Sequence, residues 1–394
     1  MIVVLGAVGL ARFAFAVVLP AMTADLSLSY REQGILGGSY FLGYFVVVVL
    51  MTWFGQRLGP KRMCTSGLAV VSAGLLGMVI GPNFATLSAS YFVVGLGSGS
   101  AFIGAMSLPA LWFHPSHRAR GAGIVAAGAG VGILVSGLFV PHVPAAFKLA
   151  DWQLIWLTFA VVTALFCGLA LLVLRDRPAE LGCTPYGEAL KQHHPGADSG
   201  IQQGATRGNW RFLVHLGTIY ALFGATALTF ATFIVTTMVD SFSIPPSTAG
   251  LLWAGVGGIS IFSGFLFGKI SDRFGHRVGM VCALSVQAIA YTLLAGGTGI
   301  TGLYISITLF GLSAWSMPTI VAAATGDYLG AERAAAGFAA LTLMFSVGQV
   351  IGPAGAGLLA DSTGSFKFAY AIAASLNVLA VLLCFFLRPP PQVP

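Results

Sequence analysis

Residues 63–117 read MCTSGLAVVSAGLLGMVIGPNFATLSASYFVVGLGSGSAFIGAMSLPALWFHPSH, and no Asp, Glu, Lys or Arg occurs among them. Gly81-Pro82-Asn83 divides this stretch into two apolar runs, because Gly and Pro interrupt regular structure. Each run reaches the length of about 18 residues that a helix needs to cross a bilayer. Neither run alternates polar with apolar residues, so the stretch indicates two membrane-spanning helices rather than strands of a closed barrel.

The composition extends this interpretation to the whole chain. Of its 394 residues, 57% are hydrophobic and only 8% are charged, and the mean hydropathy is +0.90. Soluble globular proteins carry about a quarter of charged residues, so a water-soluble enzyme and a disordered chain are both excluded. The net charge of +7 comes from basic residues in short loops and does not indicate nucleic-acid binding. The five Cys are scattered and predict no disulfide, metal site or cofactor.

Charged residues mark the ends of twelve expected spans, six on either side of a polar segment. We therefore expect an all-α polytopic membrane protein in three parts. These are an N-terminal six-helix bundle over residues 1–174, a cytoplasmic linker over 175–211, and a C-terminal six-helix bundle with a short tail over 212–394. Residues 2–22 are interpreted as the first span and not as a cleaved signal.

The orientation follows from the basic residues, which are retained on the cytoplasmic side of a membrane. With the N-terminus inside, most of the 19 Lys and Arg lie in cytoplasmic loops, and only Arg31, Lys148 and Lys367 lie outside. We expect a multi-pass protein of the bacterial inner membrane with both termini in the cytoplasm.

The two expected bundles contain matching basic turns. Gln56-Arg57-Leu58-Gly59-Pro60-Lys61 aligns with Asp272-Arg273-Phe274-Gly275-His276-Arg277, and both lie between the second and third span of their half. Arg118 and Arg333 each open the fifth span of their half. Internal repeats of this kind are typical of transporters whose site lies between the halves near the membrane midplane.

The second turn, read as Gly268-x-x-x-Asp272-Arg273-x-Gly275-x-Arg277, resembles the signature loop of the major facilitator superfamily. The resemblance covers the whole chain, and Arg175-Asp176-Arg177-Pro178 is similar to the linker start of several organic-anion branches. It implies a monomeric transporter in a lipid bilayer and not an enzyme. It also implies gating roles for a set of loop residues, namely Gly268, Asp272, Arg273, Gly275, Arg277, Arg57, Arg118 and Arg120.

The chain departs from the family pattern at several positions. Thr52 and Gln56 stand where the family has Gly and Asp in the first copy of the loop. Tyr91 replaces the Arg that usually precedes the glycine pattern beginning at Gly95, so no proton-coupling role is carried over from that Arg. The Gly348-x-x-x-Gly352-Pro353 motif resembles an antiporter motif but lies in the eleventh span, so it does not predict antiport.

Arg12 is the one charged residue expected inside a span. It lies about 16 Å along a helix that starts at Met1, since each residue adds about 1.5 Å. A charge at that depth costs about 2.5 kcal/mol or more and indicates a functional site. The alternative is a structural Arg that pairs with backbone carbonyls or reaches toward the interface. A guanidinium can bind a carboxylate through two parallel hydrogen bonds, and its helical face includes Gly9, Phe15, Ala16 and Leu19.

The twelve acidic residues all fall in expected loops or at span ends. A transporter that exchanges a cation for a proton usually needs a carboxylate within the membrane. Cation antiport is therefore disfavoured. Any proton would travel on the substrate or in net-neutral symport, and a facilitator without coupling is also compatible.

Further candidates for substrate contact lie in four spans. Thr226, Thr229, Thr232 and Thr236 lie near one face of the seventh span, where they could line a polar cavity or bond to their own helix carbonyls. Tyr40 and Tyr44 share a face of the second span, and Trp315 lies in the tenth; packing is the alternative for each. The predicted substrate-binding set is Arg12, Phe15, Tyr40, Tyr44, Thr226, Thr229, Trp315 and Gln349.

These observations favour a secondary transporter or facilitator that moves a small organic anion by alternating access. Efflux of hydrophobic compounds is the first alternative, and a non-transporting membrane sensor is a minor one. We further expect Asp272 to dock against the positive N-terminal end of the fifth span, beside Arg118 and Arg120, when the cytoplasmic side is shut.

Overall fold

The computed structural model describes residues 1–54, 58–81, 83–113, 118–143, 150–184, 186, 209–329 and 331–387. Within these ranges all regular structure is helical, apart from one isolated bridge between Phe113 and Tyr186. Twelve segments of the described chain are long and apolar enough to cross a membrane. The predicted fold class, an all-α protein with twelve spans, is therefore confirmed.

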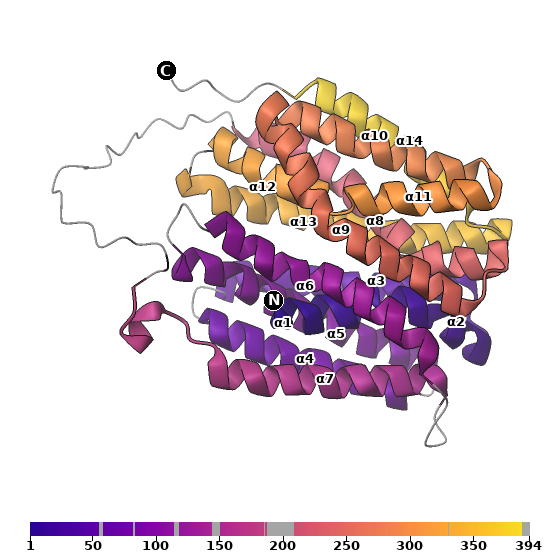
Figure 1. The fold of residues 1–394 in the computed structure, drawn as a ribbon, viewed down its shortest axis with the longest axis horizontal. Coiled ribbons are helices and arrows are strands. Elements are labelled where there is room, and N and C mark those ends of the chain that lie inside the picture. Colours follow the sequence, from indigo (N-terminus) through magenta and orange to yellow (C-terminus); the bar gives the residue numbers. More distant parts are fainter. Residues whose placement is uncertain are drawn as a thin grey trace.

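The helices run roughly parallel to one another along the long axis of the molecule (Figure 1). In chain order they are α1 (Ile2–Val4), η1 (Leu5–Phe13), α2 (Phe15–Leu26), α3 (Tyr30–Phe54), α4 (Pro60–Ile80), α5 (Phe84–Trp112), α6 (Arg118–Phe139), η4 (Val140–His142), α7 (Asp151–Val173), η5 (Pro178–Leu181), α8 (Asn209–Phe242), α9 (Pro246–Phe274), α10 (His276–Ala295), α11 (Gly299–Ser313), α12 (Ser316–Leu329), α13 (Ala331–Thr363) and α14 (Lys367–Phe385).

Two of the spans are interrupted near their middle. The first span consists of α1, the π-helix η1 and α2, which meet at Ala14. The tenth span consists of α11 and α12, separated by Ala314 and Trp315. π-helical turns, which are wider than α-helical ones, are rare in proteins, and those that occur often lie at functional sites. Both interruptions therefore mark places where the backbone departs from the twelve regular spans that the sequence predicts.

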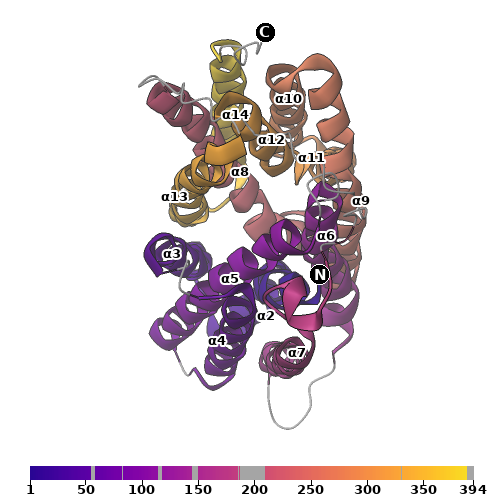
Figure 2. The same cartoon turned by 90° about the vertical axis from the view of Figure 1, so that its left-hand side faces the viewer.

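The chain forms two groups of helices that face each other. Figure 2, turned so that the molecule is seen from one end, shows the helices up to α7 on one side and those from α8 on the other. The groups meet where α3 packs against α13, where α6 packs against α9, and where α2 packs against α8. Spans one and seven therefore lie at the centre, between two outer seams.

The seam between α3 and α13 requires glycine on both helices. A Cβ atom on Gly34 would lie 2.7 Å from the carbonyl oxygen of Pro353 and 3.0 Å from the Cα of Gly357. A Cβ atom on Gly357 would lie 2.5 Å from the carbonyl oxygen of Tyr30. Such distances do not occur between real atoms, so only glycine permits this close crossing of backbones.

The two groups are also joined at one end by Tyr30. Its hydroxyl donates a hydrogen bond of 3.1 Å to Asp240 Oδ2 at the end of α8. Its ring packs edge-on against Phe366, with centroids 4.8 Å apart. We call this end of the molecule, where Tyr30, Asp240 and the glycine crossing lie, the Tyr30 end.

We predict that Gly357→Ala lowers the melting temperature of the purified protein. The added methyl group must push the α3 backbone away, and overpacking of this kind costs about 1–3 kcal/mol. Gly355→Ala is the matched control, because Gly355 lies on the same helix and a Cβ atom there meets nothing within 4 Å. Equal melting temperatures for the two variants would contradict the close crossing.

Candidate substrate site

Arg12 lies in η1 and projects among aromatic rings. Its Cζ atom is 4.8 Å from the ring centroid of Phe13, 4.8 Å from that of Phe41 and 5.9 Å from that of Tyr40. The buried Nε atom has no hydrogen-bond partner among the described residues, and no carboxylate of the described chain lies within salt-bridge distance of the guanidinium. Cation–π contacts are thus the interactions that the structure gives this charge.

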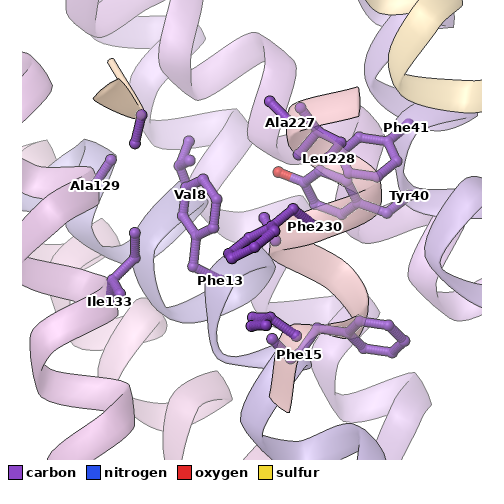
Figure 3. Close-up of a cluster of buried hydrophobic side chains, with 14 of the residues drawn as sticks. Val8, Phe13, Phe15, Tyr40, Phe41, Ala129, Ile133, Ala227, Leu228 and Phe230 are labelled. Atoms are coloured by element: carbon purple, nitrogen blue, oxygen red, sulfur yellow. The ribbon is translucent and has the colours of Figure 1, made fainter. Parts of the chain in front are cut away.

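A small cavity opens beside Arg12, between the two groups of helices. It is narrow in this conformation, with a volume of about 10 Å³, roughly the room for one water molecule. Its walls come from the first, second, fourth and seventh spans, so both groups contribute. The lining residues are Arg12, Phe13, Phe15, Ala16, Gly37, Tyr40, Phe41, Tyr91, Leu228, Ala231 and Thr232. Figure 3 shows Tyr40 and Phe41 of α3 beside Leu228 of α8.

Side chains of other spans satisfy backbone carbonyls of η1. The hydroxyl of Tyr91 in α5 donates to the carbonyl oxygen of Ala11 at 3.1 Å. The indole Nε1 of Trp253 in α9 donates to the carbonyl oxygen of Phe13 at 3.2 Å. An unpaired carbonyl within a bilayer costs several kcal/mol. These two bonds therefore stabilise the interrupted first span, and the bond from Trp253 does so from the opposite group of helices.

Tyr91 also forms part of the aromatic wall. Its ring stacks on Phe15 with centroids 4.8 Å apart and lies 5.2 Å from the ring of Tyr40. Because its hydroxyl is bonded to Ala11, Tyr91 presents a ring rather than a free donor. The hydroxyl of Tyr40, in contrast, is buried beside Ser98 and makes no hydrogen bond of good geometry in the described part of the chain. Tyr40 is thus a neutral polar group in the wall beside Arg12.

The structure brings three members of the predicted substrate-binding set together in this cavity, namely Arg12, Phe15 and Tyr40. Ala16 of the expected Arg12 face also lines it. Gly9 does not, because the π-helical turn of η1 places it against α6, where its Cβ would lie 2.7 Å from the Cα of Gly132.

The other predicted contacts lie outside the cavity lining. The Thr226 hydroxyl has acceptors on its own helix, at 3.1 Å in the carbonyl oxygen of Leu222, and on α14, at 3.3 Å in Asn377 Oδ1. Thr229 and Gln349 are buried, and Gln349 Oε1 has no partner among the described residues. Tyr44 lies one turn beyond Tyr40 with its ring 6.5 Å from that of Phe102. Their contact with substrate stays a prediction.

Trp315 stands behind the cavity wall. Its ring meets that of Phe13 edge-on, with centroids 5.4 Å apart, and its indole Nε1 donates to Ser260 Oγ at 3.2 Å. The interruption of the tenth span therefore contacts the interruption of the first span through Phe13. The sequence singled out Trp315 but not Phe41 or Trp253, which no spacing distinguishes from ordinary packing residues. Thr232 belongs to the threonine run that the sequence did identify.

The predicted gating residues lie at the end opposite Tyr30. Asp272, Arg273 and Arg277 are exposed where α9 turns into α10. The turn needs glycine at Gly275, whose φ of 89° and ψ of 155° suit no other residue. Gly268 lies earlier on α9, where a Cβ atom would make an ordinary contact of 3.7 Å with Thr319.

Three predicted gating residues cannot be placed in the same way. Arg57 lies outside the described residues, and so do the side chains of Arg118 and Arg120. The docking of Asp272 against the start of α6 therefore stays a prediction.

The chain is similar in sequence and in fold to known membrane transporters. Residues 4–385 match the family described as "Uncharacterised MFS-type transporter YbfB". The chain is similar to a "Putative tartrate transporter" of Agrobacterium vitis, with 26% identity over 94% of this chain and 85% of the relative. It is also similar to a "Hexuronate transporter" of Bacillus subtilis (strain 168), with 22% identity over 96% of this chain and 91% of the relative. Its fold resembles that of a D-xylose-proton symporter, with a TM-score of 0.77, 16% identity and coverage of 99% of this chain and 97% of that chain.

We predict that Trp253→Phe lowers the melting temperature more than Trp156→Phe does. Both changes shorten a buried side chain, but only Trp253 donates a hydrogen bond, whereas Trp156 Nε1 has no partner among the described residues. Leaving the Phe13 carbonyl unpaired should cost about 1–3 kcal/mol beyond the loss of packing. Thermal unfolding of both purified variants gives the comparison, and an equal loss would show that the bond contributes nothing.

Proposed function

The chain belongs to the family described as uncharacterised MFS-type transporter YbfB, and on that premise we propose that it moves a small organic anion across the membrane by alternating access. The family match confirms the prediction of a major facilitator transporter rather than an enzyme. The relatives named for tartrate and hexuronate transport support an organic anion, because tartrate and hexuronates are both carboxylates.

The observation that carries this proposal is the guanidinium of Arg12, which has no counter-charge among the described residues and borders a cavity between the two groups of helices. Arg stays protonated in proteins, and a buried charge without a counter-charge is costly. A carboxylate in the cavity would supply that counter-charge and would accept two parallel hydrogen bonds. Arg12 is thus proposed to bind the substrate, with Phe15 and Tyr40 as neighbouring walls.

The position of the site also fits alternating access. The distribution of basic residues supports an orientation with the Tyr30 end outside and both chain termini in the cytoplasm of a bacterial cell. The Tyr30–Asp240 bond and the crossing of Gly34 with Gly357 then form a closed outer gate. Two bundles, residues 1–174 and 212–394, would rock about the Arg12 cavity as a monomer, joined by the linker 175–211.

We predict that Arg12→Ala abolishes uptake of tartrate and of a hexuronate into proteoliposomes while the protein still folds. Removing a charge from the middle of the membrane should leave the melting temperature unchanged or raise it. Arg12→Lys should retain part of the affinity at most, because an ammonium group cannot form the two-pronged contact.

The structural alternative makes the opposite prediction for the same two variants. It expects a lower melting temperature together with ordinary substrate affinity in the protein that survives. Ordinary affinity in Arg12→Ala would rule out the anion site and would leave efflux of hydrophobic compounds as the better function.

We also predict that Asp272→Asn shifts the protein toward its inward-open state. The change removes the charge that we propose to dock against the N-terminal end of α6. The readout is the labelling rate of a single cysteine placed on the cytoplasmic side of the cavity. Asp327→Asn is the matched control, because Asp327 lies at the same end but pairs at 2.7 Å with His276 of its own half. Equal labelling of the two variants would contradict the docking.

A further inference from the structure

The cavity around Arg12 offers one positive charge and no negative one. Arg12 is the only ionised side chain in its lining, and every other wall is aromatic, aliphatic or a hydroxyl group. The acidic residues nearest in sequence to the lining residues, Asp25, Glu32 and Asp240, lie at helix ends. We infer that the site carries its substrate with a single net negative charge, so that a dicarboxylate enters it with one carboxyl group protonated. This inference rests on the proposed function.

The aromatic walls do not offer a place for a second ionised carboxylate. The guanidinium lies over the rings of Phe13 and Phe41, whose negative faces are therefore directed at Arg12. Leu228 and Ala231 add apolar surface from α8. An isolated carboxylate in such surroundings is so unfavourable that it takes up a proton instead. The walls thus discriminate by charge without any acidic residue.

Two hydroxyl-bearing side chains, Tyr40 and Thr232, line the cavity from opposite groups of helices. The Tyr40 hydroxyl is buried beside Ser98, so it must turn from Ser98 to bond the neutral part of a substrate. A hydroxyl can donate to or accept from an alcohol, an amide or a protonated carboxyl group. It cannot neutralise a charge. The substrate class that fits is therefore a hydroxylated monocarboxylate, or a hydroxylated dicarboxylate in its singly protonated form.

This charge balance determines where the proton travels. A doubly ionised dicarboxylate takes one proton from water on the entry side, Arg12 compensates its remaining charge, and the proton is released with the substrate on the other side. No side chain of the protein needs to change its protonation state. A monocarboxylate needs no proton, so its binding should not depend on pH.

The experiment titrates purified protein with tartrate, with the monoamide of tartrate and with glucuronate at several pH values, using calorimetry. Above the second pKa of tartrate, its Kd should rise about tenfold for each pH unit, because only the singly charged form binds. The Kd values of the monoamide and of glucuronate should stay constant. Tartrate affinity that depends on Arg12 but stays constant or improves as pH rises would overturn the inference.

A failure of the proposed function would look different. Binding of none of the three compounds, or binding that survives Arg12→Ala, would contradict Arg12 as the anion site and remove the basis of the inference. A tartrate Kd that changes with pH together with those of both singly charged compounds would point to titration of the protein and would also overturn it.

A gain-of-function variant tests the same charge count from the other direction. Thr232→Lys adds a second cation to the opposite wall of the cavity. The measured quantity is the ratio of the tartrate Kd to the monoamide Kd, taken at one pH unit above the second pKa of tartrate. This ratio should be about tenfold smaller in Thr232→Lys than in the wild type. Thr232→Gln is the control for size without charge and should keep the wild-type pH dependence. An unchanged ratio in a folded Thr232→Lys variant would contradict a single-charge site.

Discussion

In a hydrocarbon environment, a backbone carbonyl or a charge without a partner costs several kcal/mol. The centre of this molecule is arranged around that constraint. The first span departs from regular α-helix at η1, and Tyr91 and Trp253 donate to the carbonyls of Ala11 and Phe13 there. With the backbone satisfied from two other spans, the guanidinium of Arg12 stays among the rings of Phe13 and Phe41. The cavity, the aromatic walls and the contact with Trp315 all depend on this interrupted segment.

The periphery of the molecule follows a simpler rule, in which glycine lets backbones approach. Gly34 and Gly357 bring the outer spans of the two groups together. The Gly348-x-x-x-Gly352 motif has the same role within one group, because a Cβ atom on either glycine would collide with the α8 backbone near Ala221 and Ala225. The resemblance of this motif to an antiporter sequence thus has a packing explanation.

The sequence predicts the fold well because hydropathy and charge report directly on which residues lie in lipid. It also identifies Arg12, since one charge among apolar residues is visible without a structure. The π-helix is not predictable, because no residue pattern distinguishes its i to i+5 hydrogen bonds from those of an α-helix. The spacing of an α-helix puts Gly9 on the face of Arg12, whereas in the structure Gly9 packs against α6. The threonine run shows the same limit. Helical spacing groups Thr226 with Thr232, but α8 packs against α2, and of the threonine run only Thr232 lines the cavity.

A lone fixed cation also makes the molecule sensitive to voltage. The unloaded site carries one positive charge, whereas a site occupied by a singly charged anion is neutral. A charge that crosses the whole membrane field changes energy by about 2.3 kcal/mol per 100 mV, and Arg12 would sense a fraction of that as the halves rock. With a singly charged anion bound at Arg12 as proposed, the membrane potential would act on the empty carrier alone. It would draw the empty site toward the negative face and leave the loaded step electrically silent.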